Sequence, residues 1–159
     1  MSIFKEGYNE TYDIHAVVSY LRRLNPSIEI ALWGRSMGAV AAIRYCTQNT
    51  DVKAIVLDSP FGSLRELALH IGNQKTWLPY FIIDIFLNIV NPRIKEKSGI
   101  DIEDINNHAI INNMDVACLF VTSENDTVVK CEQVQRLFDE YHGQKELMYI
   151  DSDHHERRD

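Results

Sequence analysis

The sequence predicts an α/β fold with three layers, in which a mostly parallel sheet lies between helices on both of its faces. Short apolar runs of β-forming residues alternate along the chain with segments whose apolar residues recur at helical spacing. The runs are nearly continuous rather than alternating, as in strands buried on both faces. The 159 residues, of which 45% are apolar, are enough for one core. We therefore expect a single domain over 1–159.

The first half of the chain holds four predicted elements. Apolar residues recur at helical spacing until Asn25-Pro26, a pair that stops a helix. Small alanines line one side of a second helical segment, with larger apolar residues on the other. In order, the pattern predicts a helix at 10–24, a strand at 28–33, a helix at 37–48 and a strand at 53–57.

The second half begins with a stretch, 63–113, that is longer than one crossover between parallel strands needs. Its apolar spacing predicts helical pieces at 64–71 and 80–90 and a weaker one at 105–111, so we expect a helical, lid-like insertion. A strand at 116–122, a helix at 130–141 and a strand at 146–150 complete the pattern.

Charge and cysteine usage exclude some classes of partner. The formal net charge is −7 and no basic run exceeds Arg157-Arg158, so a nucleic-acid surface is not expected. Cys46, Cys118 and Cys131 lack the spacing of metal ligands, and an odd number of cysteines cannot pair completely. We expect reduced thiols, no metal and no cofactor.

Targeting segments are not expected either. The first ten residues, MSIFKEGYNE, lack the apolar stretch of a signal peptide. The most apolar window, 77–90, is interrupted by Pro79 and Asp84 and is too short to cross a bilayer. These features favour a location in a reducing compartment, the cytosol.

The motif with the most chemical content is G-R-S-M-G, which places Ser36 between Gly34 and Gly38. A serine on a sharp turn from a strand into a helix exposes its hydroxyl, and glycines two residues before and after it avoid a collision with the neighbouring backbone. The helix N-terminus adds a positive dipole end. Two simpler interpretations remain: a serine that caps the helix, and a phosphate-binding turn, although the G-x-G-x-x-G spacing is absent.

Partners for a nucleophilic serine follow later in the chain. Glu124 and Asp126 come after the strand at 116–122, and His154 and His155 come after the last strand. This order, serine then acid then histidine, is that of a hydrolase triad at the carboxyl ends of parallel strands. Asp58 also ends a strand and is a rival acid. Asp126 could instead form a turn or cap a helix, and a histidine pair could simply be solvated.

Four stretches together resemble the motifs of α/β-hydrolases: LWGRSMGA, VLDSPFGSL, LFVTSENDTVV and DSDHHERR. The sequence is most similar to the group of serine aminopeptidase-like and protein depalmitoylase-like enzymes. The resemblance implies that Ser36 is the nucleophile, Asp126 the acid and His154 the base, and that the Met37 backbone N–H is an oxyanion donor. It also implies hydrolysis of an ester, thioester or peptide bond through an acyl-enzyme.

The sequence departs from that group at three places. Ser123 replaces a glycine that usually precedes the acid, and His155 replaces a common asparagine. The group also places four strands before the first helix, including the loop that gives the second oxyanion donor. We therefore expect the last four strands of the fold, with the strand at 28–33 exposed as an edge that favours self-association. The alternative to an active hydrolase is therefore a chain with weak activity, or one that acts only as a binding module.

The insertion also contains aromatic residues that are candidates for a substrate pocket. In this fold a lid occupies the corresponding position, so Trp77, Phe81 and Phe86 could line a pocket for an acyl or peptide substrate, together with Phe61 of the D-S-P-F motif. Packing of the same residues against the sheet is the alternative.

Overall fold

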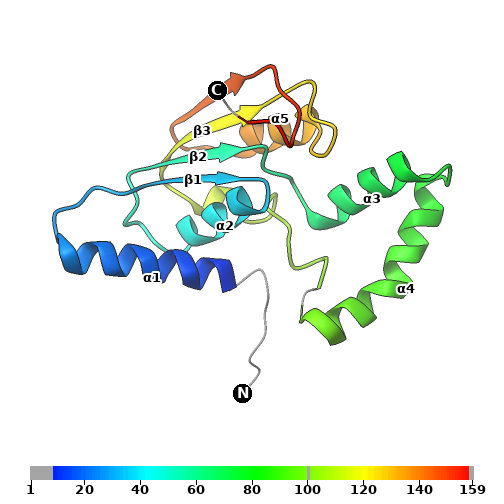
Figure 1. The fold of residues 1–159 in the computed structure, drawn as a ribbon, viewed down its shortest axis with the longest axis horizontal. Helices are drawn as coiled ribbons and strands as arrows, with labels where there is room; N and C mark the ends of the chain where they lie inside the picture. Colours follow the sequence, from blue (N-terminus) through cyan, green and yellow to red (C-terminus); the bar gives the residue numbers. More distant parts are fainter. Residues whose placement is uncertain (1–8, 100, 158–159) are drawn as a thin grey trace.

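The computed structural model describes residues 9–99 and 101–157 of the chain and contains one parallel sheet (Figure 1). Its strands run in the order β1-β2-β3-β4, and each pairs in parallel with the next. The strands are β1 (Ala31–Arg35), β2 (Ala54–Asp58), β3 (Ala117–Thr122) and β4 (Lys145–Tyr149). The predicted parallel sheet is confirmed, and the C-terminal ends of all four strands lie at one edge.

Helices connect the strands, as the apolar spacing predicts. They are α1 (Asn9–Leu24), α2 (Met37–Cys46), α3 (Leu64–Lys75), α4 (Tyr80–Ser98) and α5 (Cys131–Glu140), with a short 3-10 helix, η1 (Ile111–Asn113). The helix predicted at 105–111 is wrong. The Leu64 N–H bonds Ile105 O and the Asn107 N–H bonds Gly62 O, so this segment pairs with the start of α3 instead of coiling.

The first strand begins three residues later than the sequence predicts. The Ile28 N–H bonds Asn25 O, so the turn after α1 continues past Pro26. At the other end β1 extends to Arg35, which pairs with Asp58. The strand therefore leads directly into the turn at Ser36.

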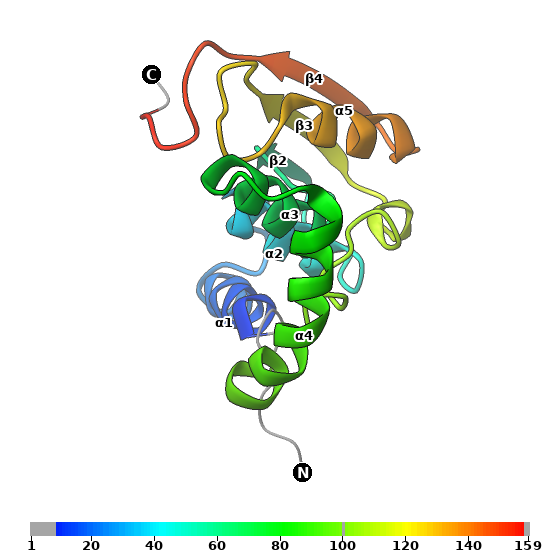
Figure 2. The same cartoon turned by 90° about the vertical axis from the view of Figure 1, so that its right-hand side faces the viewer.

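The core lies on the face of the sheet that carries α2 and α5, two helices that Figure 2 shows beside β2 and β3. Ile55 and Phe120 pack there with residues of α2 and α5, such as Ile43 and Leu137, and all four side chains are at most 1% exposed. On the opposite face Trp33 of β1 is 70% exposed. The described residues thus form the sheet and one layer of helices. The second helical layer that the sequence predicts, on the face of Trp33, is not found among them.

Tyr141, which follows α5, ties the core to the start of β3. Its buried hydroxyl donates to Val116 O at 2.6 Å and accepts from the Val116 N–H at 3.0 Å. Tyr141→Phe leaves both backbone groups unpaired, so we expect a loss of about 1–3 kcal/mol in the free energy of unfolding. Urea denaturation measures it. Tyr149→Phe is the control, because its hydroxyl makes an exposed bond to Gln135 and its loss should cost less than about 0.5 kcal/mol.

Candidate active site

Ser36 occupies the turn between β1 and α2 in a strained backbone conformation. Its φ is 53° and its ψ is −116°, in a region that residues with a side chain rarely adopt. The Ser36 N–H bonds Asp58 O at 2.8 Å, which anchors the turn to the neighbouring strand. The hydroxyl makes no capping hydrogen bond to α2, so Ser36 does not act as a side-chain cap for this helix.

Only one of the two flanking glycines is required by the packing of this turn. A Cβ on Gly34 would lie 2.2 Å from Gly38 O and 2.6 Å from Ala39 N, both backbone atoms that cannot move aside. A Cβ on Gly38 would meet no heavy atom of the described chain within 4 Å. The expectation that a side chain at position 38 would collide with the neighbouring backbone is therefore wrong, because that position faces open space beside the first turn of α2.

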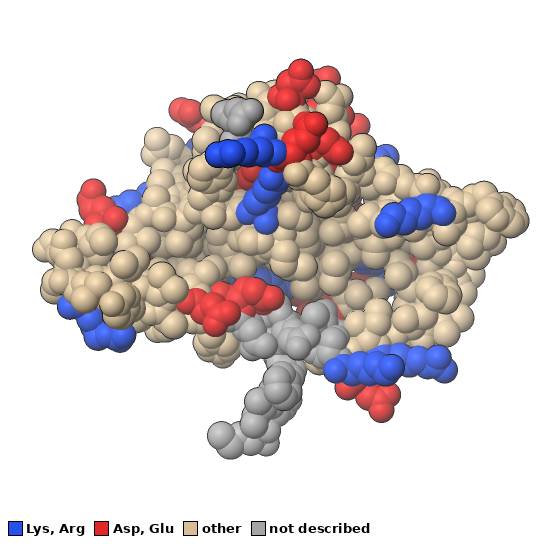
Figure 3. Space-filling model, in the orientation of Figure 1, with Lys and Arg blue, Asp and Glu red and all other residues tan. Residues whose placement is uncertain are grey.

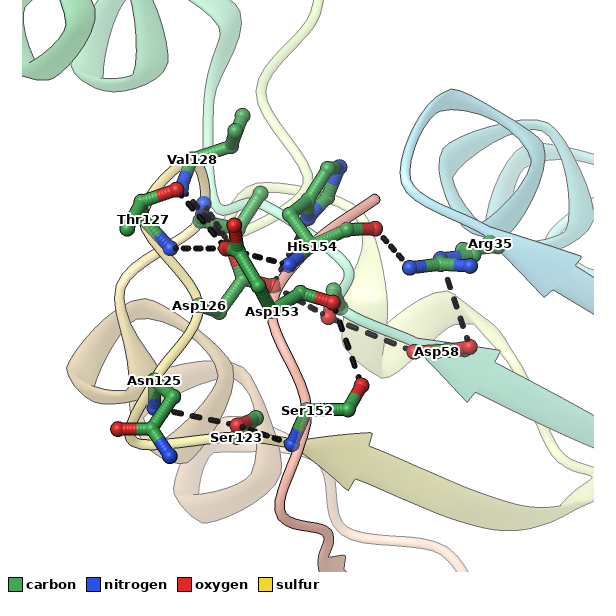
Figure 4. A network of polar contacts seen from close by, with 12 residues as sticks. Arg35, Asp58, Ser123, Asn125, Asp126, Thr127, Val128, Ser152, Asp153 and His154 are labelled. Atoms are coloured by element: carbon green, nitrogen blue, oxygen red, sulfur yellow. Dashed lines mark hydrogen bonds and ion pairs between the residues drawn. The ribbon is translucent and has the colours of Figure 1, made fainter. Parts of the chain in front are cut away.

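Asp126 and His154 form a buried pair in the loops that follow β3 and β4 (Figure 4). His154 Nδ1 lies 2.8 Å from Asp126 Oδ2, and the two side chains are 6% and 0% exposed. Because a carboxylate can only accept, the His154 Nδ1–H donates and Nε2 is left as the acceptor nitrogen. This is the tautomer that a general base beside a serine requires.

The Asp126 carboxylate is held by three further hydrogen bonds. Its Oδ1 accepts from the N–H groups of Val128 and Val129, at 2.9 and 2.8 Å, and its Oδ2 accepts from Ser59 Oγ at 2.8 Å. The interpretation of Asp126 as a turn former is thus also correct: one oxygen shapes the loop while the other orients His154. No role was predicted for Ser59, which has a φ of 50° and is fully buried.

The rival residues lie elsewhere. Asp58 is buried at the end of β2, where its carboxylate lies 3.8 Å from Arg35 Nε. Glu124 is exposed at the surface of the loop after β3. His155 is exposed, and its ring meets that of His154 edge to face at 5.2 Å between centroids. Of the predicted alternatives, the structure brings together Asp126 and His154.

Two charged residues fix the backbone of the loop after β4 that carries His154, which we call the histidine loop. Arg35, directly before Ser36, donates to His154 O (Figure 4) and also to Glu156 O. Asp153 Oδ1 accepts from the His154 N–H at 2.6 Å and from the N–H and hydroxyl of Thr127. The hydrogen bonds from Thr127 and His154 lower the pKa of Asp153 below its ordinary value. These contacts join three segments: the turn of Ser36, the histidine loop, and the loop after β3 that carries Asp126, which we call the acid loop.

Ser36 and His154 are connected through this framework and not by a direct bond. Within residues 9–99 and 101–157 the structure records no hydrogen bond between Ser36 Oγ and the His154 ring. In enzymes without substrate the bond from nucleophile to base is commonly long and shortens in the complex. Because Arg35 holds the His154 carbonyl, the histidine loop lies beside the end of β1.

Comparison with known proteins identifies the family. The family model described as serine aminopeptidase, S33, matches residues 9–108, which is more than half of the chain. The chain belongs to the serine aminopeptidase S33 family. The match begins at α1 and includes the turn of Ser36, and it confirms the predicted relationship to hydrolases.

Individual relatives of this S33-family chain are consistent with that assignment. The uncharacterized protein YqkD of Bacillus subtilis (strain 168) is 27% identical over 154 residues, which are 94% of this chain and 49% of the relative. The esterase Pf2001 of Pyrococcus furiosus is 28% identical with a TM-score of 0.69, over 91% of this chain and 53% of that one. The chain spans about half the length of both.

More distant structures agree on the fold alone. The monoacylglycerol lipase of Paleococcus ferrophilus is 16% identical, with a TM-score of 0.63 over 94% of this chain and 67% of that one. The predicted α/β-hydrolase fold is therefore confirmed, and the S33-family chain matches such proteins over part of their own length.

The predicted pocket residues do not form one buried group in the described part of the S33-family chain. Phe61 is 1% exposed and belongs to the core, whereas Trp77, Phe81 and Phe86 are 92%, 65% and 60% exposed. An open pocket of about 930 Å³ has Asp126 among its lining residues instead, and none of these four residues lines it. It is bounded by the acid loop, α3 and α5, with His70, Lys130 and Arg136 among its lining residues.

Helix α3 supports the acid loop through two side chains. Gln74 donates to Thr127 O at 2.8 Å and lies 3.0 Å from Nε2 of His70, which is 7% exposed. Burial, followed by the charge of Lys130, lowers the pKa of His70 below its ordinary value of 6.5. The neutral imidazole is thus the form that the folded S33-family chain favours.

This shift predicts a loss of stability in mild acid. Because the folded state holds the pKa of His70 below its unfolded value, the contribution of His70 is fully present above about pH 6.5 and declines as the pH falls through the folded pKa. When the pH is lowered from about 7.5 to about 5.5, we expect the free energy of unfolding to fall less in His70→Gln than in the wild type. Urea denaturation at each pH measures it. His142→Gln, at an exposed position, should behave as the wild type. Parallel losses in wild type and His70→Gln would contradict the assignment.

Proposed function

We propose that the chain is a serine hydrolase in which Ser36, His154 and Asp126 act as nucleophile, general base and orienting acid. The observation that carries the proposal is the buried pair of His154 Nδ1 and Asp126 Oδ2, 2.8 Å apart, beside the end of the strand that leads into Ser36. The strained backbone of Ser36 supports it, because such strain concentrates at functional sites.

The chemistry would follow the acyl-enzyme route. Ser36 Oγ attacks the substrate carbonyl carbon while His154 Nε2 takes the hydroxyl proton, and Asp126 stabilises the imidazolium that forms. The Met37 N–H, at the start of α2, donates to the developing oxyanion. His154 then returns its proton to the leaving group, and a water molecule activated by the same nitrogen releases the acid and restores Ser36.

We propose slow turnover for this chain by itself. Met37 is the one oxyanion donor that we assign among the described residues, and the absence of one donor typically costs about 10²–10³-fold in rate. An ester is the proposed substrate class, because Pf2001 is described as an esterase. Esters also have a better leaving group than amides.

The substrate class is tested by comparing matched acyl donors. A p-nitrophenyl ester, the corresponding thioester and an aminoacyl p-nitroanilide would be offered to the wild type and to Ser36→Ala. We expect turnover of the ester that is lost in Ser36→Ala. Preference for the anilide would instead support a peptidase, and equal rates for both proteins would contradict the proposed nucleophile.

A second candidate function is association through the edge of the sheet. Within the described residues β1 pairs only with β2, so its other edge is open, and Trp33 on this strand is 70% exposed. An unpaired edge recruits further strands. Sedimentation analysis across a range of concentrations tests this: self-association that Trp33→Lys weakens supports it, and a monomer throughout contradicts it.

The thiols support a reducing compartment. Cys46 and Cys118 are buried and Cys131 is half-buried, and all three are free. Burial raises the pKa of Cys46 to about 12, so its thiol stays protonated and unreactive. We propose the cytosol as the location. No helix in the described part of the chain is long and apolar enough to cross a membrane.

A further inference from the structure

Asp58, at the end of β2, is a buried carboxylate that the proposed reaction does not use. It is 1% exposed. Leu57 before it belongs to the core, so the side chain of Asp58 points to the opposite face of the sheet, the face on which Trp33 is exposed. The burial of a charge is costly unless the charge is paired. Asp58 is nevertheless buried on a face where the described residues place no helix.

Arg35 lies beside Asp58 at the end of the neighbouring strand. The two residues are partners in the register of β1 and β2, so their side chains share one face of the sheet. Arg35 Nε lies 3.8 Å from Asp58 Oδ2 (Figure 4). The backbone oxygen of Asp58 also accepts the N–H of Ser36 at 2.8 Å. Asp58 therefore contacts both Arg35 and the turn that follows it.

The far end of the Arg35 side chain bonds the histidine loop. Its Nη2 donates to His154 O, and its Nη1 donates to Glu156 O at 2.9 Å. A guanidinium carries several donors in one rigid plane, so it can contact a carboxylate and two carbonyl groups at the same time. These bonds hold the backbone of the histidine loop at the end of β1.

The two attachments of the histidine loop determine different quantities. The bond from His154 Nδ1 to Asp126 directs the imidazole and fixes its tautomer. It does not fix the distance from the imidazole to Ser36, because Asp126 belongs to the loop after β3. Arg35 belongs to the strand that leads directly into Ser36, so its bonds to the histidine loop determine that distance.

We propose that Arg35, held by Asp58, is a positioning residue that keeps the His154 imidazole beside Ser36. It acts through the backbone carbonyl of His154 and takes no part in proton transfer. The proposal rests on the proposed roles of Ser36 and His154, and it adds a role for the residue between Gly34 and Ser36. A displacement of about 1 Å between reacting groups costs about 10²-fold in rate, so such a link has a large effect.

The alternative is an ion pair that only stabilises the fold. Figure 3, in the orientation of Figure 1, shows both basic and acidic atoms on the surface near the ends of the strands, so charge alone does not single out Arg35. Its acceptors do. An arginine that only balanced the charge of Asp58 would need no bonds to neutral carbonyl groups, one of which lies 119 residues further along the chain.

Two variants separate positioning from charge balance. Arg35→Met removes the guanidinium and leaves the buried Asp58 carboxylate without its charge. Arg35→Met combined with Asp58→Asn removes that carboxylate charge as well, so the double variant should regain much of the free energy of unfolding that Arg35→Met loses. Both proteins should label with a fluorophosphonate about tenfold to a hundredfold more slowly than the wild type, as second-order rate constants.

Arg65→Met is the matched control. Arg65 also pairs with a carboxylate across two elements, since it bonds Asp84 at 2.6 Å between α3 and α4, but it does not contact the histidine loop. Its removal should change the rate constant of labelling by less than about twofold. Urea denaturation of all four proteins shows that each is folded under the conditions of labelling.

Deuterium exchange of the histidine loop gives a second measurement that does not depend on activity. The N–H groups of Asp153, His154 and Glu156 are hydrogen-bonded within the loop, so their exchange reports how often the loop opens. Peptides covering 150–157 should exchange about fivefold faster in both Arg35 variants, because two bonds to the loop are lost. Exchange in Arg65→Met should match the wild type.

The outcomes distinguish this proposal from the proposed hydrolase function. Slow labelling in the double variant supports positioning, whereas labelling restored to the wild-type rate would assign Arg35 to charge balance and overturn it. Labelling that Arg35→Met and Arg65→Met change equally would also overturn it. An unlabelled wild type contradicts the proposed nucleophile instead. The exchange measurement then decides alone whether Arg35 holds the loop: faster exchange supports the link, and unchanged exchange overturns it.

Discussion

His154→Ala should react with a fluorophosphonate about 10²–10⁴-fold more slowly than the wild type, measured as the second-order rate constant of labelling. His154 Nε2 is the nitrogen left to accept the Ser36 proton, since Nδ1 is bonded to Asp126. Without it the serine hydroxyl stays protonated and is a weak nucleophile. His154→Gln gives a second measurement, because its side chain retains hydrogen-bonding groups that help the buried loop to fold.

His155→Ala is the matched control for this experiment. His155 is exposed and its ring meets that of His154 edge to face, so its removal should change the rate constant by less than about threefold. Equal losses in the two variants would contradict the assignment of His154. A large loss in His155→Ala alone would assign the base to His155.

Gly34→Ala should destabilise the fold by about 3 kcal/mol, the largest stability effect that we expect. The added methyl carbon would lie 2.2 Å from Gly38 O and 2.4 Å from Gly38 C, so β1 and the first turn of α2 would have to separate. Urea denaturation measures the loss. In the same experiment the labelling of Ser36 should decline, because the turn that presents it depends on this contact.

Gly38→Ala tests the same motif with the opposite expectation. No heavy atom of the described chain lies within 4 Å of its added Cβ, and alanine is the better residue in a helix. We expect a gain of up to about 1 kcal/mol in the free energy of unfolding. A loss at Gly38 as large as that at Gly34 would show that the motif is packed differently.

Much of the fold follows from local patterns in the sequence. The helices at α1 and α2 and the strands β2 and β3 are found within a few residues of the predicted bounds, because their apolar spacing and flanking turns act locally. The segment at 105–111 has helical spacing but forms hydrogen bonds to the start of α3. Such long-range backbone pairing leaves no mark in a local pattern.

The candidate site also has one part that local patterns predict and another part that they do not. The order of Ser36, Asp126 and His154 along the chain, each after a strand, was enough to place the acid and the histidine in neighbouring loops. The contributions of Ser59, Arg35 and Asp153 could not be predicted. Their roles depend on hydrogen bonds between loops far apart in the sequence.

Exposure was the hardest property to predict. Trp77, Phe81 and Phe86 are apolar enough to line a pocket or pack on the sheet, and both interpretations assume that they are covered. In the described chain they lie on the outer side of a hairpin. Nothing in the residue types distinguishes an inner from an outer face when α4 is apolar on several sides.

The most direct test of the account is to label the folded chain with a fluorophosphonate and map the adduct by mass spectrometry. We predict a single adduct on Ser36, absent from Ser36→Ala and slowed in His154→Ala. Ser59 is the most informative rival, because it shares a positive φ with Ser36 and its hydroxyl donates to Asp126. An adduct on Ser59 or on any other serine, or no adduct on the folded chain, would contradict the proposed nucleophile.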